Sequence, residues 1–187
     1  MEGSDTAIKT DRIHPWVRKG RRDKLLENGR RFSIKEIPVI SFIGELEILL
    51  VDTQEEKYRI LKEEQIPSDV TVEELYGRSC ENLARDVEFV IANTMYGGFS
   101  ILADGIHEGS ALCFRHIWET CAEKLEDDLL VLFPAKDTLL FAPFSHTAAV
   151  EGIREHSRRA YFHSREKMTQ QEMIFIRDRK ELALYEA

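Results

Sequence analysis

The chain has 187 residues, of which 43% are hydrophobic and 32% are charged, and its formal net charge is −8. This length suits one domain with a sizeable core, and no apolar run approaches the ~20 residues that a membrane span needs. The N-terminus lacks a signal-peptide core, and the three cysteines lack CxxC spacing, which favours buried thiols in a reducing compartment. We therefore expect a cytoplasmic globular protein that does not enter the membrane.

The charge is unevenly distributed along the chain. Residues 1–31 carry nine Lys/Arg and five Asp/Glu, whereas the remainder carries seventeen Lys/Arg and twenty-nine Asp/Glu. An acidic body repels phosphates, so only the basic arm could touch nucleic acid. A simpler interpretation is that this arm is solvated or docks on the acidic body. We predict a basic arm at 1–31, partly flexible or docked, and a single domain at 32–187.

Local signals in the N-terminal half predict a short helix and a hairpin before a longer helix. These elements are a helix at 21–28, strands at 45–53 and 57–61, and a helix at 71–86. Asn28-Gly29 is interpreted as the stop of the first helix. Thr71 followed by Glu74 matches a capping box, which marks the start of the helix at 71–86.

The C-terminal half alternates hairpins with helices. Strands are predicted at 87–94 and 99–104, a helix at 110–125, a hairpin at 129–143, a helix at 146–162 and a final hairpin turning at 178–179. Hairpins stand where a parallel fold would need crossovers. The predicted class is therefore α+β, a largely antiparallel sheet with about three main helices packed on it.

The segment LLVLFPAKDTLLFAP, residues 129–143, contains two unbroken apolar runs, which are typical of central strands covered on both sides. Pro134 cannot donate to a ladder and is expected to mark the end of its strand. Lys136 and Asp137 then fall in the turn, because desolvating a charge costs several kcal/mol without partners. The alternative is a functional pair in a cleft.

Several stretches also resemble a known family. These are FPAKDTLLF, GIHEGSALCFRHIW, IFIRDRKELALYE, PVISFIGELEILLVD and ELYGRSCENL. They resemble the YtpQ-like family of bacterial proteins, a domain of unknown function, over roughly residues 36 to 186. In that family the hairpin often reads as an aliphatic strand followed by a proline, a small residue, a basic residue and an aspartate, the places that residues 134–137 fill here. The resemblance implies a cytoplasmic bacterial α+β domain and carries over no catalytic residue.

The loop at 103–109 is the best place to look for catalysis, because it joins a strand to a helix and contains Asp104 and His107. The simpler interpretation is a turn with a capped helix. Catalysis at this loop, together with Lys136 and Asp137, would require both segments to lie at the same edge of the sheet. Nucleophile candidates are Cys80, Cys113 and Ser110, but no GxSxG motif singles one out.

Metal and cofactor sites are not expected. His116 and Cys121 point about 140° apart on a helix, and no CxxC, HxxxH or HExxH spacing is present. TMYGGFS lacks the phosphate-loop pattern and leads into a strand. We predict no cofactor and no metal.

Three functional hypotheses remain, of which the weakest is that the basic arm at 1–31 binds RNA or DNA while the body acts as a handle. The first is a non-catalytic protein-interaction module, such as an adaptor, an immunity-type protein or an inhibitor, whose acidic surface meets a partner with a basic surface. The second is a small enzyme with its site at the 103–109 loop. The sequence leaves the oligomeric state, the partner and the biological process open.

Overall fold

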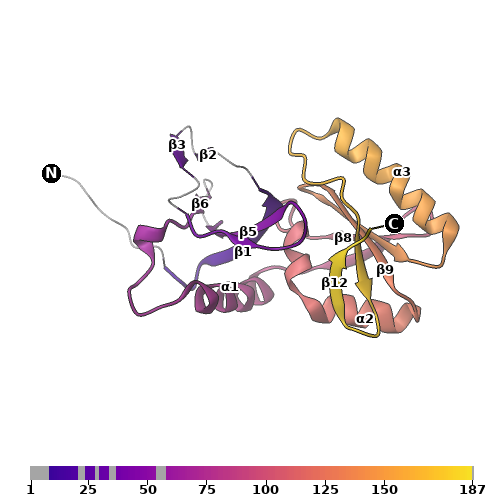
Figure 1. The fold of residues 1–187 in the computed structure, drawn as a ribbon, viewed down its shortest axis with the longest axis horizontal. Coiled ribbons are helices and arrows are strands. Elements are labelled where there is room, and N and C mark those ends of the chain that lie inside the picture. Colours follow the sequence, from indigo (N-terminus) through magenta and orange to yellow (C-terminus); the bar gives the residue numbers. More distant parts are fainter. Residues whose placement is uncertain (1–8, 21–23, 28–29, 34–36, 54–57, 187) are drawn as a thin grey trace.

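The computed structural model describes residues 9–20, 24–27, 30–33, 37–53 and 58–186, and it shows an α+β fold of antiparallel sheets and three longer helices (Figure 1). The N-terminal half of the chain builds a four-stranded sheet, called here the N-terminal sheet, and a separate two-stranded one. The C-terminal half builds a six-stranded sheet beside the N-terminal sheet (Figure 1). In the described part of the chain, no helix is long and apolar enough to span a membrane.

The N-terminal sheet is organised around its central strand, β5. Its elements are β1 (Ile13–Lys19), β4 (Ile40–Ser41), β5 (Leu46–Asp52) and β6 (Arg59–Ile60), followed by a short 3-10 turn, η2 (Glu63–Gln65), and helix α1 (Val72–Asp86). β5 pairs antiparallel with β1, β4 and β6. Leu50 faces Leu75 of α1, whereas Leu49 packs on the other side with Trp16. Because both faces of β5 are covered, nearly all of its residues are buried.

Two predictions in this half are confirmed. β5 and β6 form the expected antiparallel pair, although residues 54–57 between them lie outside the described residues. Helix α1 begins after Thr71, whose hydroxyl accepts from Glu74 N at 3.2 Å while the Glu74 carboxylate accepts from Thr71 N at 3.0 Å. This reciprocal pair is the predicted capping box.

The helix predicted at 21–28 is wrong. Strands β2 (Lys24–Glu27) and β3 (Arg30–Ser33) pair antiparallel there, with Glu27 opposite Arg30. The intervening Asn28-Gly29, which lies outside the described residues, is the dipeptide that most favours a two-residue hairpin connection. The same dipeptide also follows helices, and the local sequence did not distinguish the two uses.

Part of the predicted basic arm is a sheet strand. β1 pairs with β5 from Ile13 opposite Asp52 to Lys19 opposite Leu46, and its first five residues are buried. Removal of residues 1–31 would therefore delete a strand of the N-terminal sheet, so deletion of the arm would disturb the fold as well as any binding by the arm.

The C-terminal sheet has six strands in the order β12-β11-β9-β10-β8-β7. Its elements are β7 (Val90–Asn93), β8 (Phe99–Leu102), a 3-10 turn η3 (Glu108–Cys113), α2 (Arg115–Leu125), β9 (Leu129–Ala135), β10 (Thr138–Pro143), α3 (Thr147–His163), β11 (Met173–Ile176) and β12 (Glu181–Leu184). The three hairpins predicted from the sequence are present as β7-β8, β9-β10 and β11-β12.

Helices α2 and α3 cover opposite faces of this sheet (Figure 1). Alternate residues of β9 belong to different clusters: Leu129 and Val131 pack with Trp118 of α2, whereas Leu130 packs with Val150 of α3. This arrangement explains the unbroken apolar run, because a strand between two layers must be apolar at every position. The predicted central hairpin is confirmed.

The turn of that hairpin differs from the prediction in one detail. Pro134 does not end β9, which continues to Ala135, and the Pro134 carbonyl accepts from Met168 N at 2.9 Å. A proline carbonyl can still accept a hydrogen bond although its nitrogen cannot donate one. Lys136 is half-buried and Asp137 is exposed, as expected for a turn.

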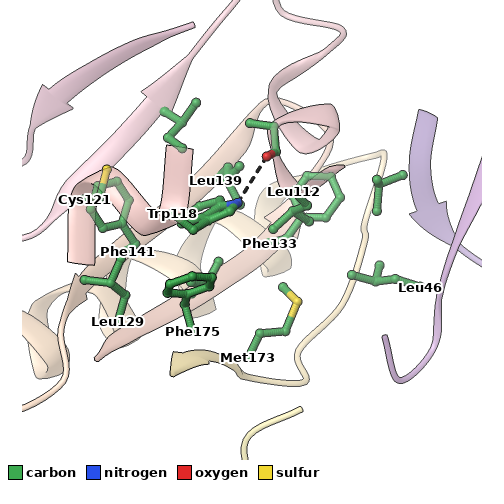
Figure 2. Packing of buried hydrophobic residues seen from close by; sticks show 14 of the residues in the cluster. Leu46, Leu112, Trp118, Cys121, Leu129, Phe133, Leu139, Phe141, Met173 and Phe175 are labelled. Carbon is green, nitrogen blue, oxygen red and sulfur yellow. Dashed lines mark hydrogen bonds between the residues drawn. The ribbon is translucent and has the colours of Figure 1, made fainter. Parts of the chain in front are cut away.

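The two sheets share one hydrophobic core. Leu46 and Ile48 of β5 and Val17 of β1 pack in the same cluster as Trp118 and Phe133. Figure 2 shows Leu46 reaching this cluster from the N-terminal sheet, and the Trp118 indole donating to the Ala111 carbonyl at 3.1 Å. The halves are therefore not independent lobes.

The helix predicted at 110–125 begins later than expected. Residues 108–113 form the 3-10 turn η3, and α2 starts at Arg115. The turn places Gly109 against the ring of Phe133 and the Ser110 hydroxyl against the Pro15 carbonyl. These tertiary contacts override the local helical signal.

We predict that Gly109→Ala destabilises the fold by about 1–3 kcal/mol, because the added Cβ would lie within 2.8 Å of Phe133 Cε1 and its neighbours in a packed core. Gly77→Ala is the matched control, since Gly77 lies in α1 with open space around it and the change should stabilise by up to about 1 kcal/mol. Urea unfolding measures both. Equal effects of the two changes would contradict the close packing of η3.

Candidate functional site at the junction of the two sheets

A cavity of about 160 Å³ lies where the two sheets meet. Its wall is built by β1, Tyr58, the end of the 103–110 segment, Phe133 and Lys136 of the β9-β10 hairpin, and residues 165–168. Five lining side chains are cationic and one, Glu166, is acidic. The cations are Arg18, Lys19, Lys136, Arg165 and Lys167.

The loop predicted as a candidate site is held together by its own carboxylates. Asp104 Oδ1 accepts from Ile106 N at 3.0 Å and from His107 N at 2.9 Å, and Oδ2 lies 2.7 Å from His107 Nδ1. Glu108 is buried, and its Oε1 accepts from Ala103 N at 3.1 Å and Gly105 N at 2.8 Å. Both carboxylates therefore satisfy loop backbone, as polar loop side chains commonly do.

His107 continues into a series of hydrogen-bonded side chains that crosses to the N-terminal sheet; its two histidines are buried and its two end aspartates are exposed. His107 Nε2 lies 3.3 Å from Thr53 Oγ1, which lies 3.0 Å from His14 Nδ1, and His14 Nε2 lies 2.8 Å from Asp86 Oδ2. The two imidazoles meet edge to face at 5.0 Å and are 3% and 2% exposed. The order Asp104, His107, Thr53, His14, Asp86 is named here the His-Thr-His chain.

Counting protons constrains this chain. Each imidazole gives one N–H to its aspartate, so two neutral rings would leave two acceptor nitrogens facing the single hydroxyl proton of Thr53. With both rings neutral, the Thr53 hydroxyl donates its single proton to one of them and leaves the facing nitrogen of the other without a proton.

The pKa values of the groups beside the threonine follow from their contacts. Burial is the main cause that lowers the pKa of His107, although Asp104 opposes it, so the neutral form of His107 is favoured. Burial alone would raise the pKa of Asp104, but hydrogen bonds from the His107 ring and from backbone amides outweigh it and lower the pKa. Hydrogen bonds from Arg85 and then His14 bring the pKa of Asp86 to about 2. Both aspartates are ionised at neutral pH.

The structure brings together some of the predicted site residues. Asp104 and His107 are in contact, and Lys136 lines the same cavity as Ile106 and Ser110. Asp137 is exposed, does not line this cavity, and accepts from the Thr138 hydroxyl at 3.1 Å. His107 lies behind the cavity wall and is not part of its lining.

The sequence analysis did not find the other three members of the His-Thr-His chain. His14, Thr53 and Asp86 were not singled out, because they come from β1, the end of β5 and the end of α1. The sequence did contain one signal. His14 stands between apolar residues in IHPWV, and a histidine buried in such a strand needs hydrogen-bond partners.

The environments of the three nucleophile candidates do not activate them for catalysis. Burial raises the pKa of Cys113 to about 12 and also raises that of Cys80, so both thiols are protonated at neutral pH. The Ser110 hydroxyl donates to the Pro15 carbonyl at 2.6 Å. Within the described ranges, no three or more His, Cys, Asp or Glu side chains gather as metal ligands would.

No family model matches the chain, and neither the curated proteins nor the solved structures include a significant match.

The lowered pKa of His107 predicts a pH dependence of stability. The unfolded chain protonates this residue near pH 6.5, whereas the folded chain protonates it at lower pH, so the free energy of unfolding should decrease as pH falls below 6.5. The decrease stops once the folded residue also protonates. Asp86 affects stability in a separate pH range. Its contribution to the free energy of unfolding is lost only as pH falls from 3.8 towards 2.

Urea unfolding between pH 7.5 and 5 should show a slope that His107→Gln reduces by up to about 1.4 kcal/mol per pH unit. His156, whose pKa is lowered mainly by burial, contributes to the same window in both proteins. The exposed His163 provides the control, and His163→Gln should keep the slope. An unchanged slope in His107→Gln would mean that this histidine does not titrate as described.

Proposed function

We propose that the protein is a non-catalytic protein-interaction module that binds an extended, basic segment of a partner along strand β7. The observation that carries this proposal is the exposed, uncharged outer edge of the C-terminal sheet. Among the residues that the structure describes, β7 pairs only with β8, and it ends the strand order. An edge strand offers unpaired N–H and C=O groups to an incoming strand.

The side chains of this edge are apolar and exposed. Val90 on β7 and Leu102 on β8 are cross-strand partners and are 49% and 44% exposed, and Ile91 is 47% exposed. Residues 89–103 contain no Asp, Glu, Lys or Arg in a chain that is 32% charged. Proteins that keep an edge unpaired usually protect it with charges or proline. The opposite edge, β12, carries Glu181 and follows Lys180.

The charge near this edge supports a basic partner. Glu88 precedes β7 by two residues and Asp104 follows β8 by two residues, so both carboxylates lie beyond the same end of the antiparallel pair. The chain as a whole carries −8. Complementary charge accelerates association and fixes the direction of an incoming strand. Adaptors, immunity-type proteins and inhibitors all belong to this class, and the resemblance to YtpQ-like proteins is compatible with each of them.

The His-Thr-His chain supports a non-catalytic role. Its two imidazoles are buried, hold each other through Thr53, and lie outside the lining of the junction cavity. Buried imidazoles that hydrogen-bond to each other through Thr53 stabilise the contact between the two sheets.

Ile91→Lys should weaken partner capture by about tenfold or more, because it places a charge on the apolar edge. The experiment is affinity purification from the native host followed by measurement of binding to the recovered partner. Ala183→Lys adds the same charge on β12 and should bind normally. Binding should also weaken as salt rises. Recovery of no partner, or equal binding by Ile91→Lys, would overturn the proposal.

The second candidate function is a small enzyme at the 103–109 loop. It is favoured by the order of Asp104, His107 and the Thr53 hydroxyl, which is that of a carboxylate, imidazole and hydroxyl triad. The distance of 3.3 Å between His107 Nε2 and Thr53 Oγ1, and the lowered pKa that favours neutral His107, suit a general base.

Hydrolysis of p-nitrophenyl acetate separates the two candidates. We expect Thr53→Val to leave the background rate unchanged, because the hydroxyl is not at the junction cavity. Ser157→Ala on α3 is the control for loss of a distant hydroxyl. A rate that disappears in Thr53→Val and His107→Gln but persists in Ser157→Ala would favour the enzyme and contradict the interaction module.

A further inference from the structure

We propose that the cavity at the junction of the two sheets binds a small aromatic oxyanion, one ring bearing a carboxylate or a phosphate. This site is separate from the β7 edge and does not depend on the partner proposed above. Its lining combines an aromatic wall with a cationic rim, which is the chemistry that such an anion requires.

The charge of the lining is opposite to that of the protein. Five cations and one carboxylate surround the cavity, although the chain carries −8. Most of this charge is already used. Lys136 Nζ lies 3.3 Å from Glu166 Oε2, Lys19 Nζ lies 3.4 Å from Glu45 Oε2, and Arg18 also has a partner. Lys167 Nζ donates to the carbonyls of Tyr161, Phe162 and Ser164. Arg165 is exposed at the rim and makes no ion pair with any residue that the structure describes. A guanidinium binds carboxylate and phosphate through two parallel hydrogen bonds.

The wall of the cavity provides an aromatic surface. Trp16 packs against Tyr58 with ring centroids 4.7 Å apart, and Lys136 Nζ lies 5.6 Å from the centroid of the indole. Trp16 is only 9% exposed, and its Nε1 is buried without a hydrogen-bond partner among the described residues. Because this N–H has almost no accessible surface, a ligand in the cavity would meet the apolar part of the Trp16 ring.

The size of the cavity selects the ligand. Its volume of about 160 Å³ is close to that of engineered apolar cavities that hold one benzene. One ring fits beside Trp16 and Phe133, and its charged group then reaches towards Lys136 and Arg165. A dinucleotide or a long acyl chain is too large for the cavity.

Titration calorimetry of the full chain tests the site with four probes: phenyl phosphate, phenylacetate, inorganic phosphate and benzyl alcohol. We expect saturable binding of phenyl phosphate or phenylacetate, and the stronger of the two identifies the anion. Inorganic phosphate and benzyl alcohol should each bind at least about tenfold more weakly than that probe, because each lacks half of the recognised chemistry. Equal binding of either one would overturn the proposal, as would no saturable binding of the two aromatic oxyanions.

Arg165→Met and Lys136→Met should each reduce the affinity for the stronger aromatic probe by about tenfold. Arg158→Met makes the same change on α3 outside this cavity and should bind normally. Because Lys136 also pairs with Glu166, circular dichroism checks that its variant folds, and the exposed Arg165 gives an independent test. Unchanged affinity in Arg165→Met, or an equal loss in Arg158→Met, would place binding elsewhere and refute the site.

Discussion

The two sheets are fixed against each other by the polar contacts of one strand, β1. Its carbonyls cannot all be satisfied within the ladder, and side chains from other elements donate to those that remain. Asn82 of α1 donates to Ile13 O at 3.0 Å, and Ser110 of η3 donates to Pro15 O at 2.6 Å. His14 lies between these two and joins Thr53 and Asp86. A buried polar group without a partner costs about 1–3 kcal/mol. The contacts that cross between the halves, Ser110 with Pro15 and His107 with Thr53, therefore specify the relative position of the two sheets, while Asn82 and Asp86 hold α1 on β1.

The apolar core alone would not set that position. Leu46, Ile48 and Val17 enter the cluster of the C-terminal sheet, but hydrophobic contact depends on area and is not directional. The His-Thr-His chain is directional, because hydrogen bonds require defined distances and angles and the Thr53 hydroxyl must meet a ring nitrogen of both histidines. The junction cavity is a consequence of this arrangement, since the strand that carries His14 also carries Trp16 to the cavity wall.

The sequence was informative wherever the determining contacts are local. The β9-β10 hairpin and the capping box of α1 depend on residues that are neighbours in the chain, so pattern and turn chemistry were enough. β1 was missed because its partner strand begins more than two dozen residues later and because its basic neighbours resemble a solvated arm. The start of α2 was misplaced for a similar reason, since contacts of Gly109 and Ser110 with distant residues set the 3-10 turn.

The same reasoning explains why the candidate site was only half visible. Asp104 and His107 are three residues apart, and their contact could be anticipated from the loop alone. Thr53, His14 and Asp86 reach His107 only after both sheets have formed and docked, so no spacing in the sequence reports them. Residues that join separate elements are also those whose removal disturbs the fold and the site together. The cationic rim of the cavity is different, because Arg165 is exposed and lies outside the His-Thr-His chain. Substitutions at Arg165 can therefore change what the cavity binds without changing the contact between the two sheets.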